Sequence, residues 1–320
     1  MRSIQCVLVF LAALVLAPFA RAQNYPTKPL KLVIPFAPAG STDIIGRVVG
    51  QKLGEALRQP VVVENRPGGG GVVGVRFAAQ SAADGYALVL SGSYMANMSV
   101  FGSNVGFDPI ADLANVATLA EIPIAIAAGN GTPFRNLGDL SAAAKASPGS
   151  LSYGTPGVGT SAHLMCEMLK LRLGIDLVHV PGKGNAPAAS DLLGGHTPLL
   201  CSNLSGLPDL KGGKLHILAV TGAHRDASVP NVPTFREAGV SGMACGTWVA
   251  FSMPARTPVT ILQRLNVAVA GILQMPDVVA VLRNAGAIPM ISTRDEFAER
   301  LEQLRRDLAE LKKSTDLKLE

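Results

Sequence analysis

Short apolar runs alternate with stretches of helical periodicity along the chain. Leu30–Phe36 is an apolar, partly β-branched run stopped by prolines, which predicts a buried parallel strand. In residues 42–57 the apolar side chains recur at helical spacing, which predicts an amphipathic helix. Further strands are expected at 61–63 and 87–90, with a helix at 72–81 between them. Strand, helix, strand, helix, strand is the order of a doubly wound lobe.

The same alternation restarts in the middle of the chain, so we expect a second lobe. Its strands are expected at 151–153, 177–180, 197–200 and 216–220, and its helices at 137–146, 161–173 and 186–193. Three helical stretches follow at 258–274, 277–284 and 293–313. Pro258 and Pro276 suit helix starts, and Thr293 suits an N-cap. The predicted fold class is α/β, with two doubly wound lobes.

The first residues have the pattern of a cleavable signal peptide. Arg2 precedes an apolar run from Ile4 to Leu16 that only Gln5 interrupts, and the small residues Ala20 and Ala22 fit a cleavage site before Gln23. A membrane anchor or a short buried helix are the alternatives, but a spanning helix needs roughly 20 apolar residues. No Cys follows the run at the cleavage point, so a lipid-anchored form is not expected. We therefore expect residues 1–22 to be removed and the protein to be periplasmic.

Charge and cysteine content narrow the possible partners. The net charge of +5 is spread along the chain, which suits an anionic small molecule but not nucleic acid, since nucleic acid requires a clustered basic face. After export Cys166, Cys201 and Cys245 remain, and an odd number leaves at least one thiol unpaired or paired between molecules. We expect buried free thiols, with a Cys201–Cys245 bridge as the alternative that sequence leaves open.

Two strand–loop–helix junctions of the same kind, residues 35–43 and 154–163, carry the functional prediction. Both are rich in small residues, which allow the backbone to approach a ligand closely. The N–H groups at the start of each following helix lack internal partners and attract an anion. Neither loop contains Arg or Lys, so a carboxylate held there would meet neutral N–H and O–H donors. An ordinary helix cap is the alternative for either loop alone.

Catalytic and cofactor motifs are weak. Gly69-x-Gly71-x-x-Gly74 matches a dinucleotide fingerprint, but a loop separates it from the preceding strand and no acid follows at the required spacing. The histidines are scattered without metal-ligand spacing. We expect no catalytic residues, no metal and no cofactor. His163, on the first turn of a helix, is either a polar wall of the ligand site or a capping-turn residue with a nearby partner.

Motifs in order along the chain carry a resemblance to a known family. They are Tyr25–Pro29, Val33–Pro38, Gln59–Gly68, Asp84–Tyr86, Gly159–Ser161 with His163–Leu164, Val178–Pro181 with Lys183–Gly184, Asp191–Gly195, Leu218–Thr221, and Val232–Thr234 with Glu237–Gly239. The chain resembles the Bug/TctC receptors, the extracytoplasmic solute receptors of tripartite tricarboxylate transporters.

The resemblance implies a Venus-flytrap fold similar to that of periplasmic binding proteins, with a carboxylate between the lobes. It also implies that the chain crosses twice, so that residues 23–122 and 252–320 form one lobe and 123–251 the other. The expected ligand-binding residues are Phe36, Ala39, Gly40, Ser41, Thr42, Asp43, Ser91, Ser93, Gly157, Gly159, Thr160, Ser161, His163, Gly182 and Asn203. The expected partners are a small carboxylate and either membrane transporter subunits or a sensor, with the receptor itself a monomer.

Three positions depart from the family pattern. Ala39 replaces a usual glycine, Gly182 stands where an aromatic residue is common, and Ser202 stands where an acid is common. Loss of the acid and of the aromatic wall predicts a bulkier ligand without a primary amine. The alternatives are an orphan receptor that signals without a transporter, and an enzyme of the same architecture. For the enzyme, Asp43 and His163 are the cross-lobe pair that could act as acid and base.

Overall fold

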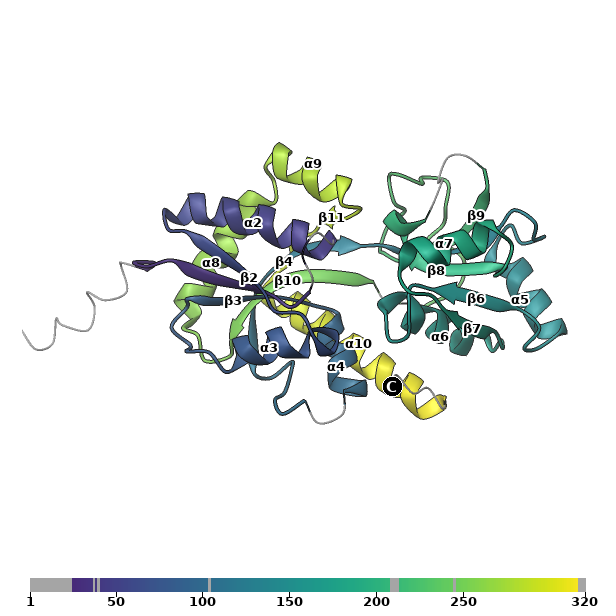
Figure 1. Cartoon of the computed structure of the whole chain (residues 1–320), viewed down its shortest axis with the longest axis horizontal. Helices are drawn as coiled ribbons and strands as arrows, with labels where there is room; N and C mark the ends of the chain where they lie inside the picture. The colour runs from purple at the N-terminus through teal and green to yellow at the C-terminus, as the bar shows by residue number, and fades with distance from the viewer. Residues whose placement is uncertain are drawn as a thin grey trace, which may run out of the picture.

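The protein consists of two α/β lobes joined side by side along its long axis (Figure 1). The computed structural model describes residues 25–36, 38, 41–102, 105–207, 213–243 and 246–315. The expected signal peptide lies outside these residues, as do Ala39, Gly40 and Cys245. Among the described residues the strands form one sheet of six and one of five, which confirms the predicted two-lobed α/β fold.

The first lobe is built on the six-stranded sheet, whose strand order is β11-β4-β10-β3-β1-β2. The strands are β1 (Leu30–Ile34), β2 (Val61–Asn65), β3 (Ala87–Gly92), β4 (Leu113–Ile122), β10 (Thr247–Pro254) and β11 (Ile288–Pro289). β1 pairs in parallel with β2 and β3, whereas β10 runs antiparallel to β3 and β4.

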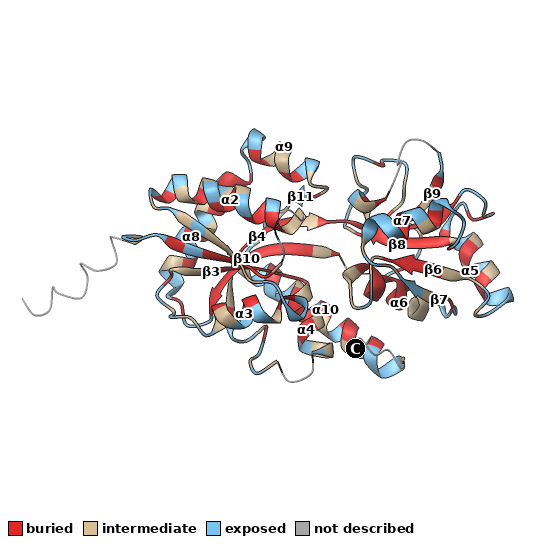
Figure 2. Ribbon diagram, in the orientation of Figure 1, coloured by how far each residue is buried: buried red, intermediate tan, exposed pale blue. Residues whose placement is uncertain are grey.

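Helices cover both faces of this sheet. They are α2 (Ser41–Leu57), α3 (Val72–Ala79), α4 (Tyr94–Phe101), α8 (Val259–Ile272), α9 (Pro276–Asn284) and α10 (Arg294–Ser314). Side chains alternate across a strand, so Leu32 and Ile34 pack in one core with α2, α8 and α9, while Val33 packs in the other with α3, α4 and α10. The strands are buried and the outer helix faces exposed (Figure 2).

The second lobe is built on the five-stranded sheet, in the order β7-β6-β8-β5-β9. Its strands are β5 (Ile124–Gly129), β6 (Ser152–Thr155), β7 (Val178–Pro181), β8 (Leu199–Asn203) and β9 (Leu215–Val220). Its helices are α5 (Leu137–Ala146), α6 (Ser161–Leu173) and α7 (Asn185–Leu193). α5 and α6 pack on one face of the sheet, and α7 packs on the other.

The chain passes from the first lobe to the second between β4 and β5, where the expected boundary at 122/123 falls. The expected return at 251/252 falls inside β10 and needs correction. All of β10, from Thr247 onward, pairs within the first sheet. No strand is predicted here from the sequence, because the apolar run Trp248–Phe251 is only four residues long and so short a run does not distinguish a strand from a helix. Helices α8, α9 and α10 then pack on the first lobe.

The expected free thiols are corrected at two positions. Cys166 on α6 and Cys201 on β8 form a disulfide, with Cα atoms 6.4 Å apart. α6 packs directly over the sheet that contains β8, so both residues point into the same core. The alternative bridge between Cys201 and Cys245 is therefore wrong.

No single helix among the described residues is long and apolar enough to cross a membrane. α8 and α9 meet the length and composition criteria only when taken together, across a bend of 81°.

Candidate functional site

A cavity of about 440 Å³ lies between the two lobes. Phe36 and Ser91 lie at the carboxyl ends of β1 and β3, and Pro156 and Asn203 lie at those of β6 and β8. Crevices outside the carboxyl ends of strands are where open α/β sheets bind ligands. The fold thus brings the two loops singled out in the sequence to one common cavity.

The structure places the expected residues in three groups. Those that line the cavity are Phe36, Thr42, Ser91, Ser93, Gly159, Thr160, Ser161 and Asn203. Ser41, Asp43, Gly157, His163 and Gly182 are described but do not line it. Ala39 and Gly40 lie outside the described residues.

Further lining residues were missed by sequence reasoning. They are Gly70, Tyr94, Asn97, Val158, Ala162, Asn185, Thr247, Trp248 and Val249, with Pro156 inside the second loop. Tyr94 and Asn97 belong to α4, a helix that directly follows β3 and makes a third strand–helix junction at the same edge. That junction was the available signal. Thr247–Val249 belong to the unpredicted strand β10, which gave no such signal.

The first-lobe wall is held by contacts to neighbouring elements. Phe36 meets Tyr94 edge to face with ring centroids 5.0 Å apart. Ser91 Oγ lies 2.6 Å from Ser252 Oγ, and Ser93 Oγ accepts a hydrogen bond from the Trp248 backbone N–H at 3.3 Å. Both serine hydroxyls therefore tie β3 to β10 beside the cavity.

Asp43 supports the first loop from outside the cavity. It is 3% exposed, and its carboxylate accepts hydrogen bonds from Arg47 Nε and Asn65 Nδ2, each at 2.8 Å. Asn65 Nδ2 also donates to the Phe36 carbonyl at 3.1 Å. The carboxylate thus bonds to residues of its own lobe and helps to hold the loop, and its expected contact with a ligand stays a prediction.

The second-lobe wall is the start of α6. Thr160 caps this helix, because its hydroxyl accepts from the His163 N–H at 3.3 Å and donates to the Gly157 carbonyl at 2.8 Å. Within the described part of the chain, no hydrogen bond occupies the N–H groups of Ser161 and Ala162. Both residues line the cavity. The residues that carry these two donors, at the positive end of a helix, therefore border the cavity.

His163 lies behind this loop, which supports the capping-turn interpretation over the polar wall. It is 2% exposed, and its Nδ1 accepts a hydrogen bond from the Gly159 N–H at 3.1 Å. Its ring stacks on His179 at a centroid distance of 3.9 Å. Burial, and then the neighbouring His179, lower the pKa of His163 to about 4, so the ring is neutral near pH 7. Burial also lowers the pKa of His179.

Gly182 does not form the expected gap in the cavity wall. Its N–H donates to the Thr155 carbonyl at 2.8 Å, and a Cβ added here would lie 2.7 Å from that oxygen. The backbone around Gly182 packs too closely for a side chain without a shift of the strand.

The cavity lining carries hydroxyl, amide and aromatic groups but no charged side chain among the described residues. Asp43 and His163, the pair suggested for an enzyme, both lie outside the lining. No group of three or more His, Cys, Asp or Glu in the described ranges is arranged to hold a metal ion. The arrangement suits binding of an anion by neutral donors.

Two α/β lobes around a cleft lined by helix beginnings define the class of periplasmic solute-binding proteins. The family model described as "Tripartite tricarboxylate transporter family receptor" matches residues 45–313. The chain belongs to this family.

Individual relatives agree with the family match. Protein BugT of Bordetella pertussis is 35% identical over 292 residues, which cover 90% of this chain and 89% of that protein. A solved R. palustris protein with adipate is 31% identical, with a TM-score of 0.73 over 91% of this chain and 98% of its own. MatC from Rhodopseudomonas palustris, with bound malate, is 27% identical, with a TM-score of 0.72 over 90% of this chain and 99% of its own.

Proposed function

We propose that this protein is a periplasmic receptor that captures a small organic carboxylate without a primary amine and passes it to a tripartite tricarboxylate-type transporter. The observation that carries the proposal is the cavity between the lobes, whose described lining has no charged side chain and includes Ser161 and Ala162, residues whose amides have no hydrogen-bond partner in the described part of the chain. The solved relatives that hold adipate and malate support a dicarboxylate as the ligand class.

Neutral donors are sufficient for useful affinity. A hydrogen bond to a charged group contributes on the order of 1.5–3 kcal/mol. Four such bonds would supply about 8 kcal/mol, the free energy of micromolar binding. The free-energy cost of ordering the two lobes around the ligand reduces this sum.

The same cavity lining disfavours ligands that carry a primary amine. An ammonium group taken out of water requires a carboxylate partner or several acceptors. No acid lines the cavity among the described residues, and Asp43 is already bonded to Arg47 and Asn65. An α-amino dicarboxylate would therefore lose more on entry than its deaminated analogue.

The test is calorimetry and thermal shift on residues 23–320 with matched ligand pairs. Succinate, malate and adipate are compared with aspartate, 2-aminoadipate and a neutral sugar. We expect at least one dicarboxylate to raise the melting temperature and to bind about tenfold or more tightly than its amino analogue, because an unpaired charge is expensive to bury. Tighter binding of the amino acids, or stabilisation by the sugar alone, would contradict the proposal.

A hydroxyl substitution locates the binding to this cavity. Ser161→Ala is expected to weaken the best dicarboxylate about three- to tenfold, since one donor to a charged group is lost. Ser190→Ala on α7, whose hydroxyl bonds to the Ala186 carbonyl, is the matched control and should bind as the unchanged protein does. Equal affinity in both variants would place the ligand elsewhere.

Export is tested at the N-terminus. The signal pattern of residues 1–22 predicts that mass spectrometry of a periplasmic extract finds a chain that begins at Gln23. Recovery only in the cytoplasm with Arg2 still present would contradict export.

A further inference from the structure

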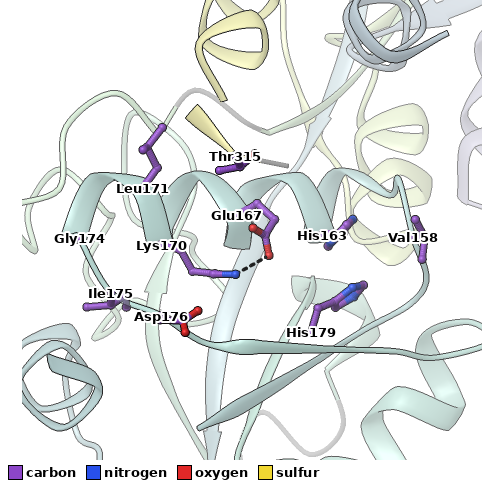
Figure 3. A pocket seen from close by; sticks show the side chains of 10 residues that line it. All are labelled: Val158, His163, Glu167, Lys170, Leu171, Gly174, Ile175, Asp176, His179 and Thr315. Atoms are coloured by element: carbon purple, nitrogen blue, oxygen red, sulfur yellow. Dashed lines mark hydrogen bonds and ion pairs between the residues drawn. The ribbon is translucent and has the colours of Figure 1, made fainter. Parts of the chain in front are cut away.

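Three aromatic rings form a column directly behind the second-lobe loop. Tyr153 on β6 stacks on His179 of β7 at a centroid distance of 5.0 Å, and His179 stacks on His163 of α6 at 3.9 Å. Figure 3 shows His163 on the helix and His179 below it, both beside the turn that carries Val158. They line a second cavity of about 570 Å³ on the side of the loop away from the cleft.

Each imidazole holds one polar group of the loop. His163 Nδ1 accepts from the Gly159 N–H at 3.1 Å. His179 Nε2 lies 2.7 Å from the Thr155 hydroxyl, which in turn accepts from the Gly157 N–H at 3.2 Å. Gly157 and Gly159 have φ values of 154° and 74°, a region that side chains disfavour, so the loop depends on these bonds for its shape.

The charged groups nearest the column, Glu167 and Lys170, are paired with each other and not with the imidazoles. Glu167 on α6 accepts hydrogen bonds from the Tyr153 hydroxyl and from Lys170 Nζ, the latter at 3.0 Å. Asp176 also lines this cavity, and so does Thr315, the residue after the end of α10. Among the described residues no carboxylate accepts a hydrogen bond from either imidazole. The charge of Glu167 raises the pKa of both rings, but burial outweighs it and keeps each pKa below its usual value.

We propose that His163 and His179 are positioning residues for the ligand, because they fix the loop so that the Ser161 and Ala162 amides remain free and face the cleft. This inference rests on the proposed carboxylate site. Because His163 accepts the hydrogen bond of the Gly159 N–H, that amide is not available to an anion, whereas the amides of Ser161 and Ala162 are. Without that acceptor, the two glycines allow the loop to turn its amides elsewhere.

The test compares substitutions that remove or retain the acceptor. His163→Ala removes it, whereas His163→Asn places an amide oxygen near the position of Nδ1. With adipate and malate as probes, we expect His163→Ala to lower affinity about tenfold and His163→Asn to stay within about threefold, since the loss is that of one loop-fixing hydrogen bond. His179→Gln, which keeps a group near Nε2, should likewise retain more affinity than His179→Ala. His224→Ala, at an exposed residue, is the control.

Two readouts separate positioning from general stability. In the free protein, nitrogen NMR should show His163 protonated at Nε2 and unprotonated at Nδ1 near pH 7. A protonated Nδ1 would overturn the proposal whatever the ligand. From pH 7 down to 4, affinity should fall more steeply in the unchanged protein than in His163→Asn, because an imidazolium cannot accept from Gly159. Titration of the ligand is common to both proteins and cancels in their ratio.

The outcomes distinguish this inference from the proposed function. If the unchanged protein binds a dicarboxylate and folded His163→Ala binds it equally well, positioning is overturned while the function stands. If His163→Asn is as weak as His163→Ala, positioning by the acceptor is overturned as well. If the unchanged protein binds no carboxylate, the proposed function fails, and the NMR measurement still decides whether His163 holds Gly159.

Discussion

At the scale of single residues, backbone conformation identifies one position that the sequence does not mark. Arg58 directly follows the last residue of α2. Its φ is 54°, and among the described residues it is the non-glycine residue whose φ is positive. Helices commonly end with a glycine in this left-handed conformation, because any Cβ is strained there. Arg58 is exposed and closes the turn by an N–H to Glu55 carbonyl bond at 3.3 Å.

Arg58→Gly is therefore expected to stabilise the protein. Glycine removes the strain at this φ in the folded state, but it also increases the conformational entropy of the unfolded chain. The first contribution is the larger, so the free energy of unfolding should rise by about 0.5 kcal/mol. Urea denaturation checks this as a higher midpoint with an unchanged slope. The same substitution at exposed Arg283, inside α9, is the control and should lower stability by about 1 kcal/mol. A loss at both positions would show that residue 58 carries no strain.

At the scale of elements, periodicity predicted the amphipathic helices closely. The helix expected at 161–173 is α6, and that expected at 137–146 is α5, with the same bounds. Thr293 caps α10 through a capping box with Glu296, as its side-chain chemistry indicated. α5 and α10 each carry an apolar stripe and a side-chain cap, so their sequences indicate them without tertiary information, whereas α6 is buried continuously from Ala162 to Leu169.

The elements that the sequence did not reveal are those whose burial is decided by neighbours. β4, β5 and β10 are buried along nearly their whole length, so none shows the alternation of apolar and polar residues that marks a half-buried strand. In β4 the large apolar residues Leu113, Val116, Leu119 and Ile122 recur at every third position, which is closer to a helical spacing. α4 is short, and its apolar residues form no stripe along one face. The cavity walls that were missed, among them Asn97 and Trp248, lie on these elements. The contacts of Asp43 with Asn65 of β2 and of His163 with His179 of β7 join elements distant in the sequence, and no local pattern encodes them.

At the scale of the whole molecule, α10 joins the two lobes. It is anchored on the first lobe, where Arg294 Nε donates to the Asn115 carbonyl of β4 at 3.0 Å, and its later turns pack against α6 of the second lobe. There Arg172 meets Glu310 through two contacts of 3.3 and 3.2 Å, with Asp307 at 3.7 Å. Figure 1 shows α10 running from the first lobe toward α6.

This ionic contact lies at the opposite end of α6 from the cavity. Arg172 is eleven residues beyond Ser161, roughly 16 Å along the helix axis, and it does not line the cavity. In this structure the two ligand loops line one cavity, and the contact between Arg172 and Glu310 is formed at the same time. A ligand bridging the loops stabilises that arrangement, so the contact and the ligand favour the same state.

Arg172→Met is therefore expected to weaken binding without touching the ligand. Methionine keeps the length of the apolar stem but removes the charge that joins the two lobes. The affinity for the best dicarboxylate should therefore fall about three- to tenfold, the effect expected from losing a partly exposed ion pair. Calorimetry measures the affinity, and solution scattering of the ligand-free protein should show a larger radius of gyration. Arg305→Met is the control, because Arg305 pairs with Glu302 inside α10 at 2.6 Å and crosses no lobe boundary. If both variants bind as the unchanged protein does, or if Arg172→Met binds more tightly, then α10 does not favour the ligand-binding arrangement.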